Sequence, residues 1–197
     1  SVTLLLSLTG CHTSNVSFIV TKDEAMKRWQ SLRSNLTIEK AQSDLDAGDL
    51  DEAERTIRQV LAENPDASGV DLLAGRIALE RGWLERAYHL FRREAQLNSE
   101  NPDPHYFQGI ILQRWQKFDA ALLAYQNAYR LQPDHVEYLL ACGEMLVALD
   151  QIDEALDVLT DKLAYFDTNV GIRLAVGQLQ MMQGRYEQAI EMIQQAV

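Results

Sequence analysis

Alanine recurs every 34 residues along most of this chain, and this spacing is the feature that most limits how the chain can fold. The five positions are Ala53, Ala87, Ala121, Ala155 and Ala189. A large apolar residue stands three before and four after each alanine, an acid two before, and a very small residue twelve before. The two large residues and the alanine share one face of a helix with 3.6 residues per turn. A period of this length therefore indicates repeated pairs of packed helices.

Each repeated position has a structural interpretation. The alanine lets a neighbouring helix approach closely, and the large residues fill the space around it. The acid lies in the first turn of its helix, where exposed N–H groups favour negative charge. The large residues before the alanine are Leu50, Leu84, Phe118, Ile152 and Tyr186, and those after it are Ile57, Phe91, Tyr125, Leu159 and Ile193. The small residues, which would collide with the partner helix if enlarged, are Ala41, Gly75, Gly109, Gly143 and Gly177.

The residues between the paired helices also follow the period. Gly48, Gly82 and Gly184 occupy a position where glycine suits the end of a helix. Gln116 and Asp150 hold the same position in the other two repeats. Few strand-like alternations occur, and five repeats exceed the roughly three that a stable stack needs. The chain is therefore expected to be all-helical.

Aligned repeat by repeat, these positions form columns that resemble the sequence pattern of the tetratricopeptide repeat family. The small residue, the alanine and the large residue after it match that family's pattern in every repeat, and Pro65 and Pro133 match its closing proline. Pro102 comes three residues late, and the family's aromatic near the start of the first helix is absent. The resemblance covers about residues 34–197. It implies an all-α fold, a right-handed superhelical solenoid of about five helix–turn–helix repeats preceded by an N-terminal helix.

The start of the chain resembles a bacterial lipoprotein signal. An apolar run ends in Leu8-Thr9-Gly10-Cys11, which is similar to a lipobox, and in that family the cysteine becomes the lipidated first residue. The alternative is a short buried apolar segment with a chance cysteine. Because the chain lacks an initial Met and a basic n-region, we expect the natural protein to begin earlier. The resemblance implies a lipid anchor at Cys11 facing the periplasm, and His12 in place of Asp favours the outer membrane.

The chain is thus divided into a signal remnant, a tether, a helical extension and five repeats. Thr21 to Glu24 fit a capping box, so a helix is predicted from about residue 22 that runs unbroken into the first repeat. Trp29 is expected to pack on the first repeat as a cap. The fifth repeat lacks its end, and the natural chain is expected to continue beyond Val197. The predicted segments are 1–10, 11–21, 22–33, 34–67, 68–101, 102–135, 136–169 and 170–197.

Charge is distributed unevenly along the chain. The net charge is −11, and residues 34–67 carry nine acids against three bases while residues 136–169 carry eight against one. The acidic blocks are interpreted either as a solvated outer face or as an attraction for a basic partner. The absence of a basic stripe argues against nucleic acid, whose phosphates require Lys and Arg.

No arrangement of residues typical of catalysis is found. The four histidines do not cluster and form no metal pair, and the glycines follow the repeat period instead of a phosphate-binding loop. His105 and His135 are interpreted as residues of surface turns. Cys142, beside Gly143, is interpreted as a small buried apolar residue. We therefore expect a protein that is not an enzyme and needs no cofactor or metal.

The family resemblance implies a concave groove lined by the first helix of each repeat. Apolar positions with a few polar points suit an amphipathic or extended segment of a partner. For any one of these residues the alternative is packing between repeats, because groove and core adjoin. Arg76 and Glu144 are expected to orient that partner by charge, and charge or bulk at Tyr106 or Ile110 to abolish its capture. The predicted groove residues are Gln42, Leu45, Arg76, Leu79, Tyr106, Ile110, Gln113, Leu140, Glu144, Leu174, Gln178 and Met181.

Three functions remain open from the sequence. The first is a non-catalytic, lipid-anchored adaptor that binds a protein or peptide, for example in envelope or pilus assembly. The second is a partner- or substrate-binding arm of a larger enzyme whose catalytic domain lies beyond Val197. The third is an array that associates with itself, because an uncapped apolar end can stack on a second copy.

Overall fold

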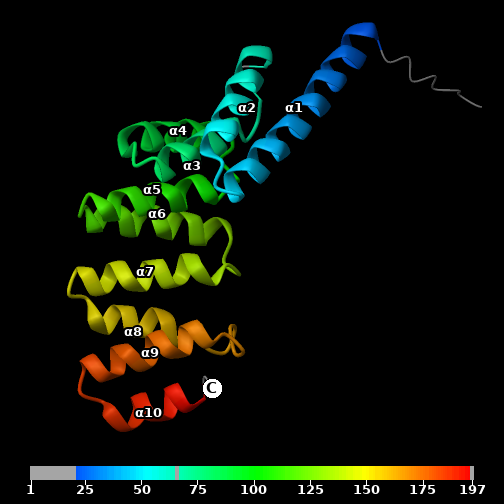
Figure 1. Ribbon diagram of the computed structural model, residues 1–197. Helices are drawn as coiled ribbons and strands as arrows, with labels where there is room; N and C mark the ends of the chain where they lie inside the picture. The colour runs from blue at the N-terminus through cyan, green and yellow to red at the C-terminus, as the bar shows by residue number, and fades with distance from the viewer. Residues whose placement is uncertain (1–20, 65–66, 196–197) are drawn as a thin grey trace, which may run out of the picture.

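A computed structural model describes residues 21–64 and 67–195 of the chain. Ten helices and no strand occur in these two ranges, stacked as successive antiparallel pairs (Figure 1). The helices are α1 Lys22–Asp46, α2 Leu50–Glu63, α3 Val70–Glu80, α4 Leu84–Leu97, α5 Asp103–Arg114, α6 Phe118–Leu131, α7 Val136–Ala148, α8 Ile152–Thr160, α9 Val170–Met182 and α10 Tyr186–Gln194. The predicted all-α solenoid of helix–turn–helix repeats is confirmed. The predicted lipid anchor Cys11 and the closing Pro65 lie outside the described residues.

The second helix of every repeat begins at the large residue that precedes the alanine, from Leu50 to Tyr186. All five alanines are 0 % exposed. The small residues of the first helices face the large residues of the second. A Cβ built on Gly75 would lie 2.5 Å from the Phe91 ring, and one on Gly177 would lie 2.7 Å from Ile193. The columns therefore record direct contacts between paired helices.

The turns between paired helices share one backbone conformation. Gly48, Gly82 and Gly184 have positive φ, as the sequence indicates. Gln116 and Asp150 adopt the same left-handed conformation, with φ of 59° and 62°. An L-residue with a side chain is strained in this region, whereas glycine is not. The repeat geometry thus imposes the turn even where the sequence lacks glycine.

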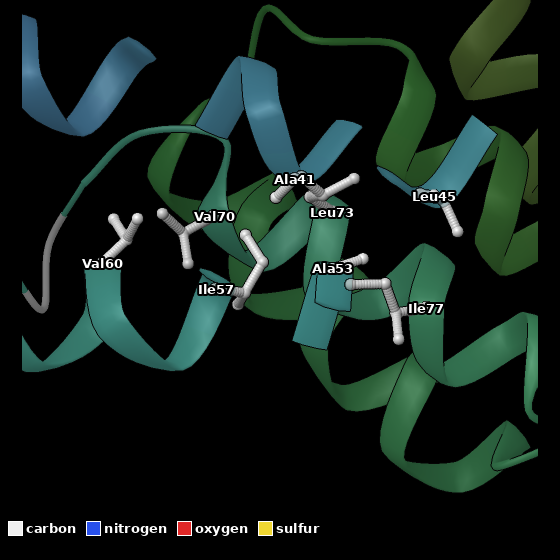
Figure 2. Close-up of a cluster of buried hydrophobic side chains, with 8 residues drawn as sticks. All are labelled: Ala41, Leu45, Ala53, Ile57, Val60, Val70, Leu73 and Ile77. Carbon is white, nitrogen blue, oxygen red and sulfur yellow. The ribbon is translucent and has the colours of Figure 1, made fainter. Parts of the chain in front are cut away.

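The hydrophobic core is a series of clusters shared between neighbouring repeats. The first cluster joins α1, α2 and α3 through Ala41, Ile57 and Ile77 (Figure 2). Further along the stack, another joins α5, α6 and α7 and contains Cys142, which is 4 % exposed. Burial raises the pKa of the Cys142 thiol to about 12. The interpretation of Cys142 as a small buried apolar residue is confirmed.

Helix α1 begins where the sequence predicts and joins the extension to the first repeat without a break. The Thr21 side chain accepts a hydrogen bond from the Glu24 amide (3.2 Å), and the Glu24 carboxylate accepts one from the Thr21 amide (2.9 Å). The prediction that Trp29 packs on the first repeat is wrong, because its side chain is 65 % exposed. The buried residues of α1 start only at Ser34, and the half of α1 before it projects from the stack (Figure 1).

Among the later helices, the prediction for His105 is wrong and α8 is shorter than its counterparts. His105 lies in the first turn of α5, where it is half-buried, and not in a surface turn. Helix α8 has 9 residues, against 14 in α2, α4 and α6. The chain that follows α8 forms turns whose side chains Leu163 and Phe166 still pack against the core.

No helix within the described ranges combines the length and apolar character needed to cross a membrane.

Candidate functional site

The predicted groove positions lie on α1, α3, α5, α7 and α9, the first helices of the five repeats. The structure brings one group of them together around an open hollow of about 390 Å³ between α7 and α9. Leu140 and Glu144 of α7 line it with Leu174 and Gln178 of α9. Most of the remaining lining is apolar. These other lining residues are Gly143, Val147, Leu159, Gly171, Ala175, Leu179 and Met182.

Several residues of this hollow are absent from the predicted groove positions, among them Met182 and Gly171. Met182 lines the hollow, whereas the predicted Met181, its exposed neighbour, does not. Gly171 lies opposite Leu140, and a Cβ built on it would reach 3.4 Å from that side chain. Gly171 stands 34 residues after Glu137, but the equivalent positions hold different residue types, so no periodic pattern identifies it. The hollow is open partly because this position has no side chain.

The predicted groove residues of the third repeat contact neighbouring side chains of the fold. The Tyr106 ring lies 5.6 Å from the Tyr125 ring and 5.0 Å from the Tyr138 ring, and burial raises its pKa. Tyr125 donates a hydrogen bond to Gln113 (2.8 Å). Ile110 packs against the same cluster. Changes at Tyr106 or Ile110 would therefore disturb folding as well as any bound partner.

Two other predicted groove residues belong to the core. Leu45 is 7 % exposed and Leu79 is 6 % exposed. Each offers a partner almost no surface in this conformation. The reason is that the groove and the core adjoin on the first helices, and in the last turn of α1 and of α3 these side chains point into the core.

The predicted role of Arg76 in orienting a partner by charge is not supported, because its guanidinium is used within the fold. It donates to Gln42 (2.5 Å) and pairs with Asp46 (3.4 Å), and it lies 5.8 Å from the centre of the Phe107 ring. Gln42 in turn donates to Asp46 (2.6 Å). This network joins the first helices of repeats one and two. The hollows beside it, of about 320 and 280 Å³, are lined partly by these polar side chains.

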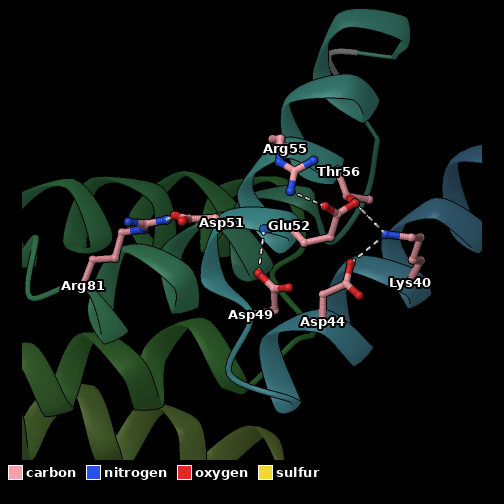
Figure 3. A network of polar contacts seen from close by, with 8 residues as sticks. All are labelled: Lys40, Asp44, Asp49, Asp51, Glu52, Arg55, Thr56 and Arg81. Atoms are coloured by element: carbon pink, nitrogen blue, oxygen red, sulfur yellow. Dashed lines mark hydrogen bonds and ion pairs between the residues drawn. The ribbon is translucent and has the colours of Figure 1, made fainter.

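The two acidic blocks differ in how their charge is compensated. Among the described residues of the range 34–67, six acids form salt bridges, for example Asp44 and Glu52 with Lys40 (2.8 and 3.1 Å) and Asp51 with Arg81 (Figure 3). In residues 136–169, all of which are described, none of the eight acids forms a salt bridge with Lys or Arg. Apart from Glu137, which contacts His135 (2.9 Å), and Asp153, which accepts a hydrogen bond from Gln183, the carboxylates of the fourth repeat are therefore available to a partner.

Glu144 combines these two properties. It is exposed, it lines the apolar hollow, and it belongs to the uncompensated block. Its negative charge also reaches the neighbouring aromatic cluster, where burial first and Glu144 among the further causes raise the pKa of Tyr125. The hollow between α7 and α9 thus offers an apolar floor with one acid at its side. Among the described residues, no three of His, Cys, Asp and Glu gather as a metal site.

An open stack of helix pairs with a hollow on its first helices defines a helical repeat protein. The chain belongs to the tetratricopeptide repeat family, since one family model of that description matches residues 38–102 and 108–163 and a second matches residues 146–197. No curated protein matches the chain.

Solved structures show the same fold. A crystal structure of MamA is 18 % identical with a TM-score of 0.69, covering 79 % of this chain and 91 % of that one. YrrB, described as a TPR protein with an unusual peptide-binding site, is 20 % identical with a TM-score of 0.65, covering 88 % and 89 %. At these identities the likeness shows the fold alone. The family and its fold support a protein-binding scaffold, a class that is typically non-catalytic.

Proposed function

We propose that this protein is a non-catalytic adaptor that holds a segment of a partner protein in the hollow between α7 and α9. The observation that carries the proposal is the coincidence of that hollow with uncompensated acidic charge. Leu140 and Leu174 would contact an apolar side chain of the partner, and Glu144 would face a Lys or Arg beside it. An apolar anchor gives most of the affinity, while a charge contact selects the partner and its orientation.

Selection from a peptide-display library on the 197-residue chain tests this function. We expect enrichment of peptides in which an apolar residue stands beside Lys or Arg. Leu174→Arg should abolish their binding, because Leu174 lines the hollow, whereas Leu123→Arg on the outer helix α6 should not. Leu123 is 61 % exposed, so it is a matched leucine away from the hollow. Enriched peptides that bind both variants equally would place the site elsewhere.

The charge contact has its own control pair. Glu144→Gln should weaken the selected peptides by roughly tenfold, the effect of losing about 1.4 kcal/mol from a charge-assisted contact. Glu154→Gln removes an acid of the same repeat from α8, outside the hollow, and should change binding little. Equal effects of the two variants would show a general attraction to the acidic block and no defined contact at Glu144.

We further propose that the adaptor is anchored by a lipid on Cys11 at a bacterial membrane, facing the periplasm, with the outer membrane favoured. The support is the resemblance of Leu8-Thr9-Gly10-Cys11 to a lipobox. Acyl labelling in a bacterial host, with the chain placed behind a start codon and a basic segment, tests the anchor. Label should be lost in Cys11→Ala and kept in Cys142→Ala, and label that persists in Cys11→Ala would exclude it.

A further inference from the structure

The first half of α1 carries an apolar stripe that no other part of the chain within residues 21–64 and 67–195 covers. Met26, Trp29, Leu32 and Leu36 recur at helical spacing and are 49, 65, 59 and 67 % exposed. The packing face of α1 is different: Ser34, which is buried, lies two residues from Leu32 and Leu36, about 200° around the helix. Leu32 and Leu36 therefore face away from the solenoid, while Met26 and Trp29 border the opening between α1 and the end of α2. An exposed apolar row of this size indicates an interaction surface.

Basic residues border this stripe. Lys22 and Arg33 lie on the same side of the helix as Trp29, and Arg28 lies one turn before Leu32 on its other edge. Residues 22–33 hold four bases and two acids in a chain whose net charge is −11. Arg33 pairs with Glu63 (3.2 Å), while Lys22, Lys27 and Arg28 form no salt bridge with any described residue.

The position of the stripe allows a flat surface to reach it. Helix α1 diverges from α2 toward its start, so its first half stands clear of the stack (Figure 1). The opening between the two helices is lined by Met26, Trp29 and Arg33 on one side and by Glu63 on the other. Leu32 and Leu36 are thus exposed along the outer side of the helix, and Met26 and Trp29 are exposed at the opening.

We propose that the first half of α1 binds the surface of an anionic lipid membrane. A helix with Trp and Leu on one face and Lys and Arg at its borders lies in the plane of the lipid headgroups. Its basic side chains attract the anionic headgroups while their apolar stems extend along the interface. This arrangement would hold the solenoid at the membrane with its first-helix hollow still open. The proposal does not depend on acylation of Cys11 or on the hollow between α7 and α9.

Flotation with lipid vesicles tests the proposal on the 197-residue chain carrying Cys11→Ala, so that no acyl chain contributes. We expect binding to vesicles of phosphatidylethanolamine and phosphatidylglycerol, with about tenfold less binding to phosphatidylcholine alone or at high salt. Leu32→Glu should reduce binding by about tenfold or more, because it places a charge in the stripe that would enter the lipid interface. Leu97→Glu is the matched control, since Leu97 is 70 % exposed at the end of α4 and should not affect binding.

A second measurement places the helix at the lipid. Brominated lipids should quench the tryptophan fluorescence of the chain, and Trp29→Phe should remove that quenching while Trp83 and Trp115 continue to emit. Circular dichroism should be the same for the Trp29, Leu32 and Leu97 variants as for their parent chain, since these three side chains are exposed. Absence of flotation, or equal loss in Leu32→Glu and Leu97→Glu, would overturn the proposal. A dimer in sedimentation that dissociates in Leu32→Glu, together with an absence of flotation, would also overturn it. The stripe would then contact a second copy of the chain.

Discussion

At the scale of single residues, the repeat works through pairs of matched size. Gly75 faces Phe91 and Gly109 faces Tyr125, so the positions without a side chain admit aromatic rings. In the first repeat, Ala41 and Ile57 hold the same two positions and lie in one cluster. Where the first helix has alanine in place of glycine, the second helix thus has isoleucine in place of an aromatic residue. Close packing requires this, because interiors leave little room for an extra methyl group.

Enlarging one partner of such a pair should destabilise the fold. We expect Gly75→Ala to lower the free energy of unfolding by about 1–2 kcal/mol, because the collision with Phe91 exceeds the gain in helix propensity. Adding Phe91→Ile recreates the Ala–Ile pair of the first repeat and should recover part of the loss. In Gly143→Ala the new Cβ would lie 3.2 Å from Leu159, so the effect should be small. Urea denaturation of these proteins and of the single variant Phe91→Ile measures these differences, and additive effects of Gly75→Ala and Phe91→Ile would contradict the pairing.

A buried carboxylate gives the fold a pH dependence. Burial raises the pKa of Glu94, and the negative charge of Asp71 raises it further. Ionised Glu94 is therefore disfavoured in the folded state, and its contribution to stability decreases as pH rises through the raised pKa. Glu94→Gln should raise the Tm relative to the unmodified chain at neutral pH. The difference should shrink toward about pH 4, where the unfolded carboxyl is also protonated. A difference independent of pH between 4 and 7.5 would contradict the raised pKa.

Residue contacts with a fixed spacing could be predicted from the sequence, but isolated ones could not. The collision of Gly177 with Ile193 follows from two columns that recur in every repeat. The pairing of Arg76 with Gln42 and Asp46 occurs once, so no column records it. Trp29 was misplaced for a related reason. Helical spacing shows that it shares a face with other apolar residues, but not whether that face meets the core.

At the scale of helices, the starts were more predictable than the ends. Each second helix starts at an apolar column followed by an acid, and both mark the first turn. The last column stands four residues after the alanine, so the pattern does not extend to the end of the helix. This is why the early end of α8 at Thr160 was not foreseen. Apolar spacing continues through Leu163 and Phe166, which pack against the core from a turn.

The turns with positive φ allow a test of helix ends. Gln116→Gly should stabilise the protein by about 0.5–1 kcal/mol, because glycine adopts φ of 59° without strain. Asp150→Gly should give a smaller gain, since Asp tolerates the left-handed region better than Gln. The control Gln126→Gly, at an exposed position inside α6, should destabilise by roughly 1 kcal/mol. Thermal and urea unfolding measure all three, and destabilisation by Gln116→Gly would show that its side chain makes an unrecognised contact.

At the scale of the whole molecule, the sequence predicts the stack but only part of its inner surface. The same first-helix positions are open at Leu174 and packed by aromatic rings at Tyr106. The difference depends on the neighbouring side chains, such as the missing Cβ of Gly171 beside the α7–α9 hollow. A periodic pattern identifies equivalent positions, whereas these neighbours vary from repeat to repeat. Hence the sequence identifies the equivalent first-helix positions, but it does not show which of them remain open.

Each repeat contacts mainly its neighbours, so local damage should spread along the stack only weakly. Tyr138 tests this property, because its hydroxyl donates to Asp103 (2.7 Å) and so joins α7 to α5. Tyr138→Phe leaves the Asp103 carboxylate without this donor and should destabilise the protein by about 1–2 kcal/mol. Native-state hydrogen exchange should then increase in α5 to α8, with α1 to α3 almost unchanged. The control Tyr129→Phe, at a partly buried tyrosine of α6, should have a smaller effect. A uniform increase in exchange from α1 to α10 would instead show that the solenoid opens as a single cooperative unit.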